Sequence, residues 1–393
     1  MIKQKRKDET SETEPFRNVL SFIISGWSNN FGFYVMLSAA KHMMQNKVAT
    51  SAVLICDTLP CFIIQLILPF FLDKIPYAVQ VSFIVLFALL GFILAILAED
   101  RIYLALIAVS FHSLSLGLGE TTFFAYSTKF STKCVSAFSS GTGLAGITAA
   151  GIYAILADVF HVPFKVILYI FLPVPIFMLL AFSISKPSQL KQSNNNILQN
   201  QNVDLLVSDA IPDQMPVKVE KLSFAQKLNS LKSISMFILS LFIVYTSQYS
   251  INQSVDSVID FPPPYTSKHY TFSQFAFRFG IFLARSSLPL FKFPYKFISI
   301  PSIFQVLNLI LFCFQAQFLF IKWFWAVQFL SFVEGLLGGL VYVTAMYWTS
   351  VQSSGVEKEF KMGIICVFNN FGIVVASCLG FWLQPYLKEH KKW

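Results

Sequence analysis

The sequence predicts an all-α polytopic membrane protein with about 11 transmembrane helices in a 6+5 arrangement. Hydrophobic residues make up 55% of the 393 residues and charged residues only 12%. Apolar runs recur along the whole chain, and most approach the roughly 20 residues that a helix needs to cross a bilayer. The period-2 alternation of a membrane barrel is absent, and lipid forces backbone polar groups to pair within their own segment. Helices are therefore predicted throughout.

One long polar stretch divides the candidate spans into a group of six and a group of five. The candidate spans are residues 16–40, 48–71, 78–98, 102–125, 136–157, 163–182, 233–256, 270–288, 298–320, 323–348 and 362–385. The polar stretch, 183–232, contains runs of Asn and Gln that cannot bury a core, so we expect a disordered linker. The predicted units are a tail at 1–15, a six-helix bundle at 16–182, this linker, a five-helix bundle at 233–385 and a tail at 386–393.

The chain carries a formal net charge of +9, and the placement of its basic residues predicts the topology. Lysines and arginines lie mainly in the loops between apolar runs, so membrane orientation explains them more simply than nucleic-acid binding does. They are more numerous on the side of the N-terminal tail and the linker. The positive-inside rule therefore places the tail and the linker in the cytosol, and an odd number of spans places the C-terminus across the membrane.

The sequence motifs do not indicate an enzyme. No Walker loop, HExxH, GxSxG or Rossmann fingerprint is present. The six cysteines lie mostly inside apolar runs and form no Cys-x-x-Cys pair, so we expect neither a disulfide framework nor a metal site. We also expect no cofactor. The expected partners are a small-molecule solute, either a phosphodiester or a basic amino acid, and membrane lipid.

Carboxylates inside predicted spans are the first candidate functional residues, because a charge there costs roughly 2.5–3.5 kcal/mol and usually faces a cavity or a partner. Glu334 lies midway along the tenth span and is a candidate for binding a solute or carrying a proton; the alternative is a structural ion pair. Glu120, near one end of the fourth span, is a candidate substrate ligand. Asp57 in the second span is a candidate proton-coupling residue.

Two arginines in the eighth span are the basic candidates. The guanidinium of Arg285 matches a phosphate or carboxylate through two parallel hydrogen bonds. The alternatives are that Arg285 extends to the cytosolic headgroups or pairs with Glu334. Arg278 lies seven residues earlier, which is two helical turns, so both arginines can line one wall.

Neutral polar side chains in the spans are weaker candidates. Asn29, Asn30, Ser140 and Thr142 can donate hydrogen bonds to a polar solute, although hydrogen bonds between helices explain them as well. We expect His112 to be a helix-packing histidine rather than a ligand.

A weak internal echo indicates a repeat. Residues 117–120 (GLGE) lie in the fourth span and residues 334–339 (EGLLGG) lie in the tenth, its counterpart if the two groups are related. A second echo, between 29–32 (NNFG) and 369–372 (NNFG), does not occupy equivalent spans. Six spans, a cytosolic linker and a second bundle also resemble the two-halved layout of the major facilitator superfamily, although one span fewer than twelve is a departure.

Several short runs resemble the battenin family, the lysosomal or vacuolar membrane proteins of Batten disease. The runs are Asn29-Asn30-Phe31 with VMLSAA at 35–40, GLGE at 117–120, SSGTG at 139–143 with Ala145-Gly146, Val244-Tyr245 with Tyr249 and Ile251-Asn252-Gln253, ARSSL at 284–288, and EGLLGG at 334–339 with Tyr342-Val343. They follow the order of the family and extend over most of the chain. The Asn/Gln-rich linker is this chain's own, and its C-terminus lacks the prenylation-type cysteine box of some relatives.

The resemblance implies a major-facilitator-like fold in the lysosomal or vacuolar membrane. It further implies a transporter, or a transport-supporting protein, that clears glycerophosphodiesters from the lumen and contributes to lysosomal pH homeostasis. Yeast relatives are associated with vacuolar pH and basic amino-acid uptake, so a proton-linked basic amino-acid transporter is one alternative. A non-transporting organiser of lysosomal trafficking is another.

Overall fold

The N-terminal half contains six segments of membrane-spanning scale. They are α1 (Phe16–Met44), α2 (Thr50–Ile67), α3 (Tyr77–Leu97), α4 (Ile102–Ser127), α5 (Thr132–Ala154) and the pair α6 (Phe164–Phe171) and α7 (Val174–Ile184). The pair forms one span interrupted at Pro173, because proline lacks a backbone donor and its ring clashes with the preceding turn. Short turns η1 (Leu68–Phe70) and η2 (Leu72–Lys74) follow α2, and a π-helical turn, η3 (Ile155–Val159), extends α5.

The C-terminal half contains five long segments and two short helices. The elements are α9 (Phe224–Leu231), η4 (Lys232–Ile234), α10 (Ser235–Ser250), η5 (Ile251–Val255), η6 (Asp256–Val258), α11 (His269–Ser286), η7 (Tyr295–Phe297), α12 (Ser299–Phe318), α13 (Phe324–Gln352), α14 (Gly355–Ile364) and α15 (Cys366–Glu389). The computed structural model describes residues 14–44, 50–98, 101–187, 222–265 and 268–392, and all regular structure in these ranges is helical.

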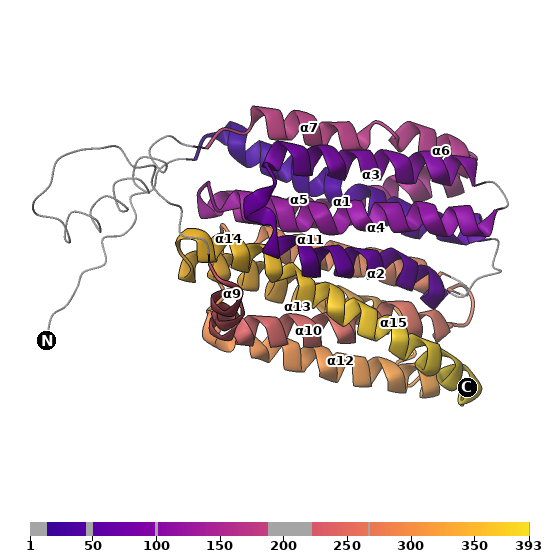
Figure 1. Cartoon of the computed structure of the whole chain (residues 1–393). Helices are drawn as coiled ribbons and strands as arrows, with labels where there is room; N and C mark the ends of the chain where they lie inside the picture. Colours follow the sequence, from indigo (N-terminus) through magenta and orange to yellow (C-terminus); the bar gives the residue numbers. More distant parts are fainter. Residues whose placement is uncertain (1–13, 45–49, 99–100, 188–221, 266–267, 393) are drawn as a thin grey trace, which may run out of the picture.

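The helices lie side by side in one bundle, with α9 and α14 at one end and the C-terminus at the other (Figure 1). Eight helical stretches of the described chain are long and apolar enough to cross a membrane, and α1, α2 and α11 occupy the other three predicted spans. Two arginines, Arg278 and Arg285, make α11 less apolar than its neighbours. The prediction of an all-α protein with several membrane spans is confirmed, and the arrangement is consistent with about eleven.

Two helices lie where the sequence predicted none. α9 falls inside the predicted linker, and its start is a capping box in which Ser223 and Gln226 each accept a hydrogen bond from the other's backbone N–H. α14 precedes the last predicted span. The expected disorder is therefore wrong for 222–232, whereas 188–221 lies outside the described residues.

Equivalent helices pack against each other in the two halves, and the halves meet at two helix–helix interfaces, which we call seams. In the first half α1 packs on α5 and α2 on α4; in the second, α10 packs on α15 and α11 on α13. The two seams are α5 against α11 and α2 against α15. Figure 1 shows both seams running along the middle of the bundle. Polar residues on the faces of these four helices that meet at the seams are therefore positioned between the halves.

The internal echo in the sequence corresponds to equivalent packing in the two halves. A Cβ atom at Gly117 in α4 would lie 2.7 Å from the carbonyl oxygen of Cys61 in α2. A Cβ atom at Gly335 in α13 would collide with the carbonyl oxygen of Phe277 in α11. In each half, glycine thus lets the second and fourth helices approach backbone to backbone.

A Gly335→Ala substitution is expected to destabilise the protein by roughly 1–3 kcal/mol, because the added methyl group meets backbone atoms of α11. Gly151→Ala in α5 is the matched control, since no atom lies within 4 Å of the corresponding Cβ position. Thermal unfolding in detergent should show a lower midpoint only for Gly335→Ala. Equal midpoints for the two variants would contradict the close approach of α11 and α13.

Candidate functional site

Arg285 lies at the seam between the two halves and is 5% exposed. From α11 its Nη1 donates a hydrogen bond to Oγ1 of Thr142 in α5, at 2.5 Å, and its Nη2 donates to the hydroxyl of Tyr245 in α10, at 2.9 Å. One guanidinium therefore holds a residue of each half. No carboxylate of the described chain lies within ion-pair distance of it, so Arg285 does not pair with Glu334.

Tyr342 of α13 lies between Arg285 and an acidic residue. The guanidinium carbon is 3.9 Å from the centre of the Tyr342 ring, within the range of a cation–π interaction. The hydroxyl of the same tyrosine donates to Oε1 of Glu120 in α4, at 3.4 Å. Glu120 is 5% exposed, and it interacts electrostatically with Arg285. The positive and negative groups are thus separated by one aromatic ring.

Glu120 also connects to the second seam. Nε2 of Gln65 in α2 donates to Oε2 of Glu120 at 3.1 Å, and Nδ2 of Asn370 in α15 donates to Oε1 of Gln65 at 2.8 Å. The polar network therefore crosses from one half to the other at both seams. We call it the central cluster; its members are Gln65, Glu120, Thr142, Tyr245, Arg285, Tyr342 and Asn370.

Within the central cluster, the Nε of Arg285 is a buried nitrogen donor without an acceptor in the described structure. A guanidinium has five N–H donors in a planar fork and accepts none, so the missing partner must be an acceptor. An anionic group supplied by a solute fits this requirement.

Arg278 lies two turns before Arg285 and faces the same half. Its guanidinium carbon is 4.5 Å from the centre of the Tyr34 ring in α1, and its Nε also lacks a partner within the described structure. Both arginines of α11 therefore contact residues of the N-terminal half across the seam.

Glu334 belongs to a separate network inside the C-terminal half. It is 1% exposed, and its Oε1 accepts a hydrogen bond of 2.6 Å from Nδ2 of Asn252. Nε2 of Gln274 in α11 donates to Oδ1 of the same asparagine at 2.7 Å. Asn252 lies in the π-helical turn η5, a local widening of the helix that is frequent at functional sites. Glu334 therefore has an amide partner rather than a cation.

The remaining candidates divide into neighbours of Arg285 and isolated groups. Oγ of Ser140 donates to the carbonyl oxygen of Arg285 at 3.4 Å, so Ser140 contacts the arginine backbone rather than its fork. Asn30 donates to the carbonyl of Gly26 in its own helix. Asp57 is 1% exposed, and neither of its carboxylate oxygens has a hydrogen-bond partner among the described residues.

His112 packs as expected. Its ring lies edge-on to Phe92 at 4.5 Å, and it fills the space beside Gly32 and Gly91. Asn29 donates to the carbonyl of Leu116 in α4, which is a hydrogen bond between helices. These contacts favour packing over ligand binding for both residues.

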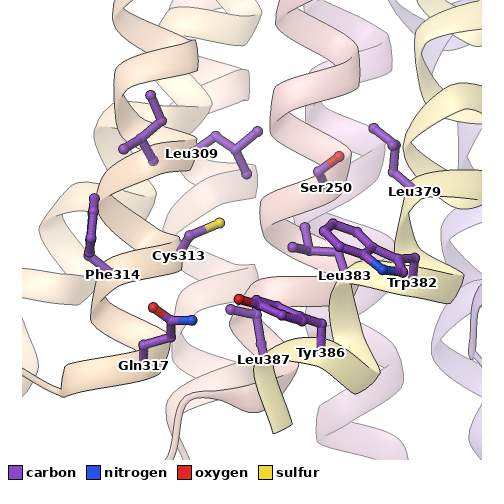
Figure 2. Close-up of a pocket in the computed structure, with 11 residues that line it drawn as sticks. Ser250, Leu309, Cys313, Phe314, Gln317, Leu379, Trp382, Leu383, Tyr386 and Leu387 are labelled. Atoms are coloured by element: carbon purple, nitrogen blue, oxygen red, sulfur yellow. The ribbon is translucent and has the colours of Figure 1, made fainter. Parts of the chain in front are cut away.

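A cavity of about 380 Å³ lies away from the central cluster. It is formed by α10, α12 and α15, and its lining includes Leu309, Cys313, Leu379, Trp382 and Tyr386 (Figure 2). Trp382 is 66% exposed and Leu379 45%, so this cavity opens on the apolar outer face of the bundle. Its chemistry suits lipid rather than a polar solute.

Comparison with known proteins identifies the family. The model of the CLN3 protein family matches residues 20–390. The chain belongs to the CLN3 protein family. This CLN3-family chain is 31% identical to Protein BTN1 of Yarrowia lipolytica and 29% identical to Protein BTN1 of Saccharomyces cerevisiae. Both alignments cover 94% of this chain, with 94% of the first relative and 95% of the second. The resemblance to battenin is confirmed.

Solved structures show the fold of this CLN3-family protein. The Escherichia coli fucose:proton symporter, a major facilitator superfamily transporter, aligns with a TM-score of 0.58 and 13% identity over 96% of this chain and 98% of its own. An outward-facing bacterial homologue of the iron transporter ferroportin aligns with a TM-score of 0.60 and 13% identity over 95% of each chain. The fold is major-facilitator-like, and family and fold resemble transporters rather than enzymes.

Proposed function

We propose that this protein exports glycerophosphodiesters, the deacylated products of phospholipid breakdown, from the lumen of the lysosome or vacuole. The observation that carries the proposal is Arg285, a buried cation at the seam between the halves with an unpartnered Nε and no carboxylate partner in the described structure. A phosphodiester has two free oxygens and one negative charge, which match a guanidinium fork.

The halves would move apart around this arginine. In an alternating-access cycle, rocking of one half against the other opens the central site to each side in turn. Arg285 holds Thr142 of the first half and Tyr245 of the second, so opening the seam must break the hydrogen bond to Thr142. A phosphate oxygen can take the place of the Thr142 hydroxyl on Nη1. Solute binding would therefore supply Nη1 with a new acceptor while the seam is open.

A basic amino-acid carrier is the second candidate. Glu120, Glu334 and Asp57 are buried carboxylates, and none has a basic side chain within ion-pair distance in the described structure. A cationic solute could neutralise one of them. Glycerophosphodiesters remain the first candidate because Arg285 would repel such a solute at the seam.

Metabolite profiling of isolated lysosomes or vacuoles tests the proposed solute. Organelles without the protein should accumulate glycerophosphodiesters several-fold, and restoring the protein should clear them. Accumulation of lysine and arginine alone would favour the second candidate. Unchanged levels of both solute classes would favour a non-transporting organiser of trafficking.

We also propose that the linker and the N-terminus lie in the cytosol and the C-terminus in the lumen, as the distribution of basic residues indicates. A tag after Trp393 should then resist protease added outside intact organelles, whereas a tag between Asn200 and Gln201 in the linker should be digested. Immunoblotting after protease treatment, with and without detergent, measures both. Digestion of the C-terminal tag without detergent would refute this orientation.

A further inference from the structure

A second buried charged cluster lies at the end of the bundle opposite the linker. Asp256 in η6 and His269 at the start of α11 are 0% and 1% exposed, and Oδ1 of Asp256 lies 2.8 Å from Nε2 of His269. Nε2 of Gln328, in the first turns of α13, lies 2.8 Å from Nδ1 of the same ring. Residues from two other elements, η6 and α13, therefore contact the two nitrogens of one imidazole.

Aromatic rings cover this pair. The imidazole of His269 lies 5.2 Å from the ring of Phe261 and 6.3 Å from that of Phe324, and Tyr265 stacks on Phe324 at 4.2 Å. Burying a carboxylate and an imidazole carries a desolvation cost that their mutual attraction often does not repay. Stability alone therefore does not account for burying this pair.

Two buried acceptor oxygens of this second cluster receive no hydrogen bond. Oδ2 of Asp256 and Oε1 of Gln328 have no hydrogen-bond partner among the described residues. A carboxylate oxygen with no donor beside an imidazole is suited to binding a proton, because carboxylate oxygens and imidazole nitrogens are both proton acceptors. Within the described structure, no group of three or more His, Cys, Asp or Glu side chains could hold a metal ion instead.

The charged and titratable groups around the pair are few. Glu334 of α13 and Tyr270 of α11 interact electrostatically with Asp256, and Arg278 lies further along α11. On the sides of α12 and α15 the neighbours of η6 are uncharged: Val258 packs in a cluster with Phe312, Ala316 and Leu387, and Gln384 donates to Ser257. Asp260, in the following loop, is exposed and paired with Lys391.

Polar side chains lead from the pair toward the central cluster. Gln328, Ser331 and Glu334 follow one another at intervals of three residues on α13, a rise of about 4.5 Å per step. Oγ of Ser331 is hydrogen-bonded to Oγ of Ser273 in α11 at 2.8 Å. Tyr342 of the central cluster lies two turns beyond Glu334 on the same helix. These side chains therefore lie along α13 between the pair and the seam.

We propose that the Asp256–His269 pair binds a coupling proton that drives solute movement. The proposal rests on the proposed transport function and names its driving ion. With a neutral imidazole the pair carries one negative charge; taking one proton from the lumen makes the pair neutral overall, and the proton leaves on the cytosolic side. One proton then moves with one solute anion, so an acidic lumen favours export.

The test uses the full chain in liposomes and glycerophosphoglycerol, a glycerophosphodiester with one negative charge. Exchange of labelled for unlabelled solute at equal pH on both sides measures solute movement alone. Accumulation under a pH difference measures coupling. For one proton and one monoanion, accumulation should reach about tenfold per pH unit in the wild-type protein, because one unit corresponds to about 1.4 kcal/mol.

Asp256→Asn and His269→Gln should keep exchange within about twofold of wild type and lose accumulation, while Asp256→Glu should retain part of it. Asp260→Asn, an exposed acid in the adjoining loop, is the matched control and should accumulate normally. If Asp256→Asn does not fold, accumulation by His269→Gln under the pH difference tests the pair instead.

Three outcomes would overturn the inference. If Asp256→Asn and His269→Gln accumulate solute as the wild type does, the pair is not the proton site. The same conclusion follows if Asp57→Asn loses accumulation and neither variant of the pair does. Wild-type exchange without any response to pH would exclude proton coupling and leave the proposed function intact. Absence of wild-type exchange would contradict the proposed function itself, and with it the coupling.

Discussion

An Arg285→Ala protein is expected to leave glycerophosphodiesters in the lumen at the level of organelles that lack the protein. The substitution removes the buried cation at the seam and both of its hydrogen bonds, to Thr142 and Tyr245. The proposed phosphate recognition should be lost, because no other basic group contacts the central cluster in the described structure. Mass spectrometry of isolated organelles, normalised to protein level, measures the effect.

Two further variants separate charge from geometry at this position. Arg285→Lys keeps the charge but offers a point donor in place of the fork, so binding should weaken by roughly 1–2 kcal/mol, the size of one charge-assisted bond. Arg285→Gln can still donate one hydrogen bond but carries no charge, so it should behave like Arg285→Ala. Normal glycerophosphodiester levels in a well-expressed, correctly sorted Arg285→Ala protein would exclude the phosphate-binding role.

Solute selectivity of the Arg285 variants distinguishes the two candidate functions. Removing a positive charge from the path should spare or increase movement of lysine and arginine if the protein is a basic amino-acid carrier. Export of glycerophosphodiesters should fall in the same preparation if they are the solute. Transport of both solute classes is measured in each variant. The two hypotheses predict changes of opposite direction.

Glu334→Gln is expected to reduce transport at least tenfold while protein level stays close to wild type. The substitution preserves an acceptor for the Nδ2 of Asn252, so the 2.6 Å hydrogen bond can form again, but the titratable charge is removed. A buried carboxyl with an amide partner and no cation does not form a permanent ion pair, and carboxylates inside membrane spans usually mark solute or ion pathways. Flux per molecule in liposomes is the decisive measurement.

Ser331→Ala is the matched control for Glu334→Gln. Ser331 lies one turn earlier on the same face of α13 and makes a neutral hydrogen bond with Ser273. It should lower flux less than Glu334→Gln does. If Glu334→Gln lowers protein level and transport equally, the carboxylate is structural.

The sequence was sufficient to find the charged residues but not their partners. A charge inside an apolar run is conspicuous, so Arg285, Glu120 and Glu334 stand out as candidates. Their assembly depends on helix rotation and on which helices form the seams, which hydropathy does not determine. The structure therefore joins Arg285 to Glu120 through a tyrosine and separates both from Glu334.

Among the neutral members of the central cluster, Thr142 was a candidate from the sequence, whereas the others were missed as site residues because nothing local distinguishes them. Gln65 and Tyr342 resemble any polar or aromatic residue in a membrane span, and Asn370 lies in an echo that does not fit a repeat. Asp256 is the last residue of a predicted span, where a side chain is usually close to water. In the structure the helix continues through the π-helical turn η5 and the turn η6, and Asp256 is buried. The sequence offered one signal for such residues, which is an amide or acid side chain inside an apolar run with no charged residue nearby.

The fold was predicted more completely than the site. Apolar length predicts spans directly, and the glycine runs at 117–120 and 334–339 correspond to close helix packing in both halves. The short helices were not predicted, because α9 and α14 are too polar to be recognised as spans. The capping box at Ser223 and Gln226 was the one local signal for α9.

Uptake of labelled glycerophosphodiester by the purified protein in liposomes tests the central claim most directly. We expect saturable uptake that other glycerophosphodiesters inhibit, that lysine and arginine leave unchanged, and that Arg285→Ala abolishes. Saturable uptake of arginine or lysine, with no uptake of any glycerophosphodiester by a protein that unfolds cooperatively and is correctly inserted, would contradict it.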